Sequence, residues 1–193
     1  LNESWFVSLH DAQQTIEAGI SVTAGKSVSW TLQNYYGRDA LAAGWGPAGL
    51  HGDIEFLDSV LTWNATPALS VIGTVDYGNI GATASTPSAT WWGGAGYVNY
   101  ALDSRWRISL RGEYFDDQDG YLTGAYIATA FPAPGPILTA AQRLKEGTLT
   151  LGYDPAKNVE LRMEGRYDAP DSVNGVRRFP DTTQAWVEAL LHF

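Results

Sequence analysis

Hydrophobic and polar residues alternate along most of the chain, most regularly between residues 158 and 168. In that stretch Val159, Leu161 and Met163 occupy every second position, and charged residues fill most of the positions between them. Side chains of a β-strand point alternately to its two faces, so this pattern predicts a strand with one apolar face and one ionic face. The same alternation at the end of the chain predicts a last strand that finishes on Phe193.

Similar alternation recurs along the chain and predicts nine strands, with a weaker signal for a tenth at residues 4–10. The nine are residues 14–23, 28–36, 53–63, 69–78, 90–102, 105–114, 143–153, 158–168 and 184–193. Short turns near residues 25, 65, 103 and 155 alternate with long loops at 37–52, 79–89, 116–141 and 169–181. This order predicts a single all-β domain over residues 1–193, built as an up-and-down antiparallel meander without helices.

Aromatic residues of the apolar face concentrate at the two ends of the predicted strands, whereas the middles carry Val, Leu, Ile, Ala and Gly. Near the short turns lie Trp63, Tyr100, Trp106, Tyr153 and Phe193, and near the long loops lie Tyr36, Tyr77, Trp92, Tyr114 and Tyr167. Membranes gather aromatic side chains at their two lipid–water interfaces, while a packed soluble core does not sort them by height. The pattern favours a transmembrane β-barrel of about ten strands over a soluble barrel with its apolar face inside.

The ionic face of such a barrel would line its interior. The predicted lining comprises Arg105, Arg107, Arg111, Arg162 and Arg166, together with Asp58, Asp76, Glu113, Glu146, Glu160, Glu164 and Glu188. Strands that carry arginines flank the strand of Glu146, so we expect ion pairs between neighbouring strands. Two hypotheses stay open: a hydrated passage with a weak preference for cations, or a narrow barrel filled by ion-paired side chains.

Composition narrows the function classes. The formal net charge of −9 argues against nucleic-acid binding, because no basic patch would lie clear of carboxylates. The chain has no cysteine, which fits an exported protein without disulfides. No apolar run is long enough for a transmembrane helix, and the chain begins at Leu1 without a visible signal peptide, so we expect a processed or truncated chain.

No motif in the chain predicts catalysis, a metal site or a cofactor, so we expect a protein that is not an enzyme. Asp116–Gly120 resembles half of a calcium loop but lacks the regular acidic spacing and the distal Glu. His10, His51 and His192 have no metal-ligand spacing. We expect the long apolar loop, residues 121–141, either to constrict the mouth of the barrel or to dock against a partner protein or a second copy.

Six segments carry a resemblance to a known family: Asn34–Gly37, Leu57–Trp63, Val75–Gly78, Leu110–Asp117, Leu144–Tyr153 and Val159–Asp168. They resemble the outer-membrane β-barrel porins of the OmpL-like type, over about residues 14–193. The resemblance implies a barrel in the outer membrane of a Gram-negative bacterium, without catalytic residues. Members of that family are generally longer at the N-terminus, which implies that this chain forms the C-terminal part of a barrel of about twelve strands.

The first functional hypothesis is a porin-like barrel in the outer-membrane lipid bilayer that lets small hydrophilic solutes or ions diffuse through a charged lumen. The alternative is a structural barrel with an ion-paired, closed lumen that binds a partner through residues 121–141. A membrane-barrel enzyme and a soluble ligand-binding barrel are two further hypotheses. The enzyme would need a Ser/His/acid set that the three histidines do not offer, and the soluble barrel would need its apolar face buried.

Overall fold

The computed structural model describes residues 15–40, 51–82, 88–120, 122, 142–171 and 180–191, and its strands form one antiparallel sheet. Within these residues the strands are β1 (Ile16–Ala24), β2 (Val28–Ala40), β3 (His51–Asn64), β4 (Leu69–Ile80), β5 (Ala89–Ala101), β6 (Trp106–Asp117), β7 (Gln142–Ala156), β8 (Val159–Asp168) and β9 (Thr182–Leu191). They follow one another in chain order across the sheet. The predicted all-β, up-and-down arrangement is confirmed, and the nine strands expected are found; residues 4–10 lie outside the described residues.

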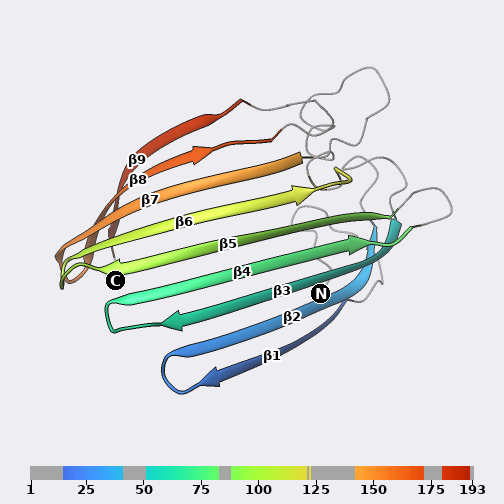
Figure 1. Cartoon of the computed structure of the whole chain (residues 1–193), viewed down its shortest axis with the longest axis horizontal. Helices are drawn as coiled ribbons and strands as arrows, with labels where there is room; N and C mark the ends of the chain where they lie inside the picture. The colour runs from blue at the N-terminus through green and yellow to red at the C-terminus, as the bar shows by residue number, and fades with distance from the viewer. Residues whose placement is uncertain are drawn as a thin grey trace.

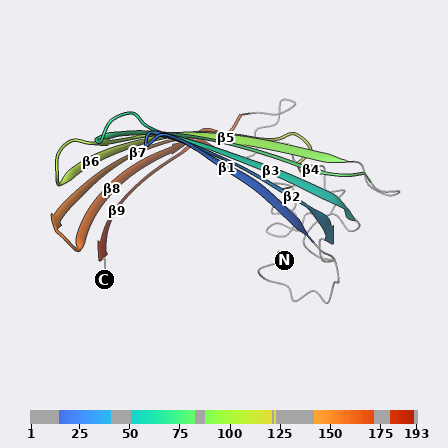
Figure 2. The ribbon, with the colours of Figure 1, turned by 90° about the horizontal axis from the view of Figure 1, so that it is seen from below.

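The sheet is bent into an open arch. Figure 1 shows the strands side by side, with the hairpin turns from β1 to β2, β3 to β4, β5 to β6 and β7 to β8 at the same end. Figure 2 shows the arch from below, with a concave and a convex side. β1 and β9 are the two edges, and in the described part of the chain they do not pair with each other. No helix in that part is both long and apolar enough to cross a membrane.

Local chemistry fixes the hairpin turns. Gly25, between β1 and β2, has a φ angle of 64°, which glycine adopts without steric cost. Between β5 and β6, Asp103 Oδ1 accepts hydrogen bonds from the backbone N–H groups of Arg105 (2.7 Å) and Trp106 (2.8 Å). These bonds favour the charged carboxylate and hold the pKa of Asp103 below its ordinary value. Arg105, which was predicted on the strand, therefore lies in the turn.

The strands extend further from the hairpin turns than the alternation predicted. β2 and β3 stay paired out to Ala40 and His51, and β6 continues to Asp117. The predicted loops 37–52, 79–89 and 116–141 are therefore too long, because residues at one or both of their ends belong to strands. A backbone ladder does not require an alternating side-chain pattern, so the Gly, Asp and Arg residues at these ends concealed the pairing.

Large apolar side chains of the central strands lie on the outside of the sheet. Val75, Leu110 and Met163 are 56%, 52% and 55% exposed. A soluble barrel would turn such residues into its interior, since burying them supplies most of its folding free energy. Their exposure argues against the soluble ligand-binding hypothesis.

Candidate pore-lining face

Most charged side chains of the strands lie on one face of the sheet, whereas Glu55, Asp116, Arg143 and Lys145 lie on the other, toward the strand ends away from the hairpin turns. In its register Arg111 on β6 stands opposite Thr148 on β7, which stands opposite Arg166 on β8. The same face carries Arg107, Arg111, Arg162, Arg166, Glu17, Asp58, Asp76, Glu113, Asp117, Glu146, Glu160, Glu164, Asp168 and Glu188. All the predicted lining residues except Arg105 thus share one surface.

This ionic face is the concave one. Along β7, buried or half-buried positions alternate with exposed ones from Gln142 to Thr150, and the less exposed set belongs to the ionic face. Arg107 on β6 reaches across β7 to pair with Glu160 on β8. Side chains from strands two apart meet in this way where a sheet curves toward them, which places the ionic face on the hollow side of the arch (Figure 2).

Two ion-pair clusters link β6, β7 and β8, and the first of them extends to Glu188 on β9. In the first, nearer the hairpin turns, Arg107 pairs with Glu160. Arg162 lies 3.0 Å from Glu160 and 2.8 Å from Glu188. Gly152 on β7 makes room for this contact, because a Cβ there would lie 2.9 Å from Cγ and Nε of Arg107. The cluster therefore depends on a missing side chain on the strand between its partners.

The second cluster centres on Glu146, whose side chain is only 6% exposed. Its Oε2 lies 3.3 Å from Nη2 of Arg111 and 3.5 Å from Nη2 of Arg166. Arg111 also pairs with Glu113, and Arg166 with Asp168 at 2.7 Å. A carboxylate removed from water needs such compensation. The expectation of ion pairs between neighbouring strands around Glu146 is confirmed.

The β3–β4 part of the concave face has no such compensation. Asp58 and Asp76 stand directly opposite each other. Within the described residues neither forms an ion pair. Like charges placed opposite one another on adjacent strands are destabilising. The concave face therefore has an ion-paired half on β6–β8 and an anionic strip on β3–β4.

An apolar cluster that the sequence pattern did not predict lies on the same face, at the strand ends away from the hairpin turns. Ile80, Ala89 and Trp91 are buried there, with Ile54, Phe56 and Phe115 packed against them. The Trp91 ring lies against Gly78 on the neighbouring strand, where a Cβ would be 2.0 Å from a ring carbon. In the alternating pattern Phe56 and Trp91 fall among the polar positions, which indicates aromatic side chains on the ionic face. Only the pairing of the strands shows that the two residues belong to one cluster.

Aromatic side chains of the convex face lie at both ends of the strands. Trp106 and Tyr153 stack near the hairpin turns with ring centroids 4.4 Å apart, and Trp92 and Tyr114 approach to 5.1 Å at the other end. Tyr36, Trp63, Tyr77, Tyr100 and Tyr167 are exposed on the same face, and Phe193 lies outside the described residues. Trp30, which the sequence pattern did not assign to this set, joins them.

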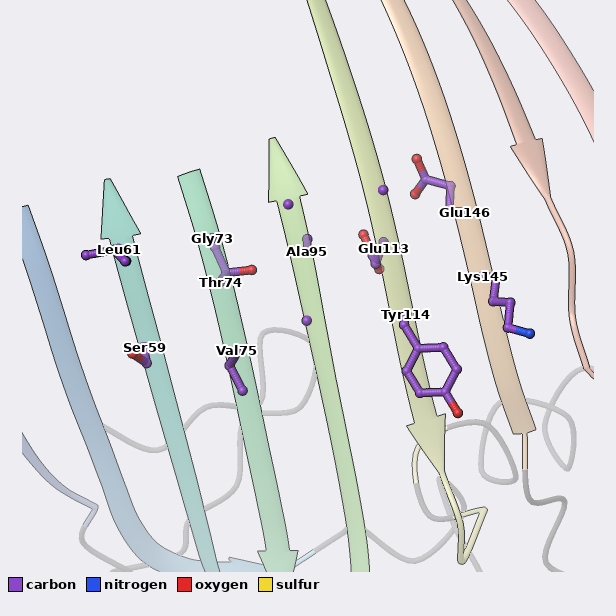
Figure 3. A pocket seen from close by; sticks show the side chains of 13 residues that line it. Ser59, Leu61, Gly73, Thr74, Val75, Ala95, Glu113, Tyr114, Lys145 and Glu146 are labelled. Atoms are coloured by element: carbon purple, nitrogen blue, oxygen red, sulfur yellow. The ribbon is translucent and has the colours of Figure 1, made fainter. Parts of the chain in front are cut away.

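Between these aromatic residues the convex face has a shallow apolar groove (Figure 3). Its volume is about 780 Å³, and Leu61, Val75 and Tyr114 line it. The floor is a row of glycines opposite one another on successive strands, Gly73, Gly96, Gly112 and Gly147. A Cβ at any of the four would meet nothing within 4 Å. The groove is a thin, open part of the apolar surface.

The described residues contain no group of three or more His, Asp or Glu side chains arranged to hold a metal ion. Asp116 lies 2.9 Å from Nε of Arg143, and Asp119 accepts a hydrogen bond of 2.8 Å from the backbone N–H of Thr90. These acidic residues of the half calcium loop therefore make structural contacts. Outside the described residues lie His10, His192 and, except for Leu122, the predicted docking loop 121–141.

Comparison with known proteins gives a family. The family model described as "Putative beta-barrel porin-2, OmpL-like" matches residues 5–193. Neither a curated protein nor a solved structure matches the chain. The family match covers every strand of the sheet, so it applies to the whole arch and to both of its faces.

Proposed function

Because the chain belongs to the family described as "Putative beta-barrel porin-2, OmpL-like", we propose that it forms a barrel in a bacterial outer membrane and lets small hydrophilic solutes or ions diffuse through a charged lumen. The convex face contacts the lipid bilayer, and the concave ionic face lines the passage. The protein catalyses no reaction, so the width and the charge of the passage set the rate.

The division of the sheet into two faces carries this proposal. On β6 the half-exposed Leu110 faces the convex side, and its neighbours Ser109 and Arg111 face the concave side. A protein surrounded by water gains free energy from the opposite arrangement. Apolar side chains outside and charged side chains inside are favourable where hydrocarbon surrounds the barrel and water fills it.

The passage prefers cations. The arginines of the concave face are held in ion pairs, whereas Asp58 and Asp76 have no cationic partner among the described residues. Carboxylates also outnumber arginines on this face. Fixed negative charge in a narrow, low-dielectric passage raises the local concentration of cations.

Planar-bilayer recording of the purified full chain under a KCl gradient tests both the passage and its preference for cations. The sign of the reversal potential should show that K⁺ passes more readily than Cl⁻. In the double variant Asp58→Asn, Asp76→Asn the reversal potential should lie closer to zero. Glu17→Gln removes a carboxylate from the same face on the edge strand β1 and should move it less. A preference for Cl⁻ contradicts the cation preference, and absence of conductance contradicts the passage.

A structural barrel with a closed lumen is the second candidate, and the two ion-pair clusters favour it. Arg107 extends over β7 to Glu160, so its side chain occupies part of the concave space. This candidate acts by binding a partner protein at residues 121–141. It predicts no conductance in the wild type and measurable conductance once Arg107 and Glu160 are both replaced by Ala, so the same recording separates the two functions.

A further inference from the structure

A second cavity lies on the concave face between β3 and β6, and its walls combine aromatic rings with carboxylates. Its volume is about 260 Å³, and its lining includes Phe56, Trp91, Tyr97, Phe115, Asp76 and Glu113. The register places all six side chains on the concave face. Diffusion of hydrophilic solutes depends on width and charge, so it does not account for aromatic walls at this place.

Of the two carboxylates in the cavity, one is paired with a cationic side chain and the other is not. Glu113 is paired with Arg111. Asp76 has no ion pair within the described residues, and it stands opposite Asp58, which has none there either. A positive charge placed beside this pair would relieve the repulsion between the two carboxylates and gain attraction from both. The cavity therefore has an uncompensated anionic side.

One ring of the aromatic wall already lies beside a cation. The guanidinium carbon of Arg111 lies 5.7 Å from the centroid of the Tyr97 ring. Ring faces attract cations electrostatically within about 6 Å. The Phe115 ring extends over Gly93, where a Cβ would lie 3.2 Å from Cδ2 of the ring, so no side chain separates it from the sheet. The rings thus form a wall that suits apolar cationic groups.

We propose that this cavity is a subsite for a small organic cation, with an alkylammonium or guanidinium group held by Asp76, flanked by the aromatic rings, and attracted also by Asp58, which stands opposite Asp76 on the neighbouring strand. A hydrated metal ion would use the carboxylates alone, whereas an organic cation also gains from the apolar walls. The subsite rests on the proposed function only in that the cation would reach it through the passage. Binding of the cation itself requires no conduction.

Thermal unfolding of the full chain in detergent tests binding independently of conduction. Tetramethylammonium chloride should raise the melting temperature above its value in an equal concentration of sodium chloride, since a ligand of the folded state stabilises that state. In the double variant Asp58→Asn, Asp76→Asn the apparent affinity should fall about tenfold or more. Glu17→Gln, the matched control, should retain the wild-type shift.

Phe56→Leu separates the aromatic contribution from the charge. It keeps an apolar side chain and every carboxylate, so the apparent affinity for tetramethylammonium should fall about threefold, less than in the double variant. Equal melting temperatures of the wild type in the two salts, or a full tetramethylammonium shift in the double variant, overturn the subsite.

The two proposals fail separately. A chain that conducts with a cation preference but does not distinguish tetramethylammonium from sodium retains the passage and loses the subsite. A chain that binds tetramethylammonium through Asp58 and Asp76 without conducting retains the subsite and loses the passage.

Discussion

At the scale of the residue, the glycines of the strands have two distinct environments. Gly78 and Gly152 face the concave side, where Trp91 and Arg107 occupy the space that a Cβ would need. Gly73 on the convex side would place a Cβ in open space. The same residue type on one face therefore admits a neighbouring side chain and on the other leaves the surface bare.

Gly78→Ala should lower the free energy of unfolding by about 2–4 kcal/mol, because the new Cβ would overlap the ring of Trp91, which is buried in the apolar cluster and would have to shift. Gly73→Ala lies on the same strand with its Cβ on the opposite face and should change that free energy by less than about 0.5 kcal/mol. Urea unfolding of the two variants in lipid vesicles measures the difference. Equal effects would contradict the assignment of the two faces.

At the scale of the element, side-chain acceptors close the hairpin turns. Asp103 holds the β5–β6 turn through the N–H groups of Arg105 and Trp106. Since those bonds lower the pKa of Asp103, its contribution to stability is present above the ordinary value of 3.8 and is lost as the pH falls through the lowered pKa. The turn is therefore weakened only in strong acid.

Asp103→Ala should destabilise the protein at neutral pH, because two backbone N–H groups lose their acceptor, and the difference from the wild type should shrink as the pH falls through the lowered pKa. Asp103→Asn keeps an acceptor oxygen and should retain more stability at neutral pH. Unfolding free energy measured against pH checks both. A wild-type advantage over Asp103→Ala that is independent of pH would exclude the charged acceptor.

The alternation predicted the strands and the face of each side chain, but not which side chains meet. The alternation of residues 158–168 by itself predicts a strand, and β8 spans nearly the same residues. The opposition of Asp58 and Asp76 follows from the register of the β3–β4 hairpin. The contact of Arg107 with Glu160 requires the curvature of the arch as well. The alternation within one strand contains no information about the register between strands or about the curvature of the sheet.

At the scale of the whole molecule, the middle of the sheet places its aliphatic side chains on the convex side and its charged side chains in the hollow. Leu110, near the middle of β6, is 52% exposed, and Arg111 beside it reaches Glu146 on the next strand. Substitutions at neighbouring positions of β6 therefore enter different surroundings.

Leu110→Lys should make folding into vesicles less favourable by about 2–4 kcal/mol, since an ammonium group at the middle of the convex face enters hydrocarbon. Ser109→Lys puts the same group on the concave face, opposite Asn99 and Thr150, where water can solvate it, and should cost less than about 1 kcal/mol. Folding titrations in urea with vesicles of one lipid composition compare the pair. Similar costs would mean that the convex side does not face lipid.

The link from Arg107 over Gly152 to Glu160 has a mechanical consequence. Arg107 on β6 also lies 3.3 Å from Asp154 on β7, so its side chain links three consecutive strands in addition to their backbone ladders, and that flank of the arch resists bending. The β3–β4 flank has no such brace among the described residues, since Asp58 and Asp76 stand opposite each other and neither forms an ion pair there. When a bulky solute passes through the barrel, the sheet should therefore deform on the β3–β4 flank, while the flank of β6–β8 keeps its shape.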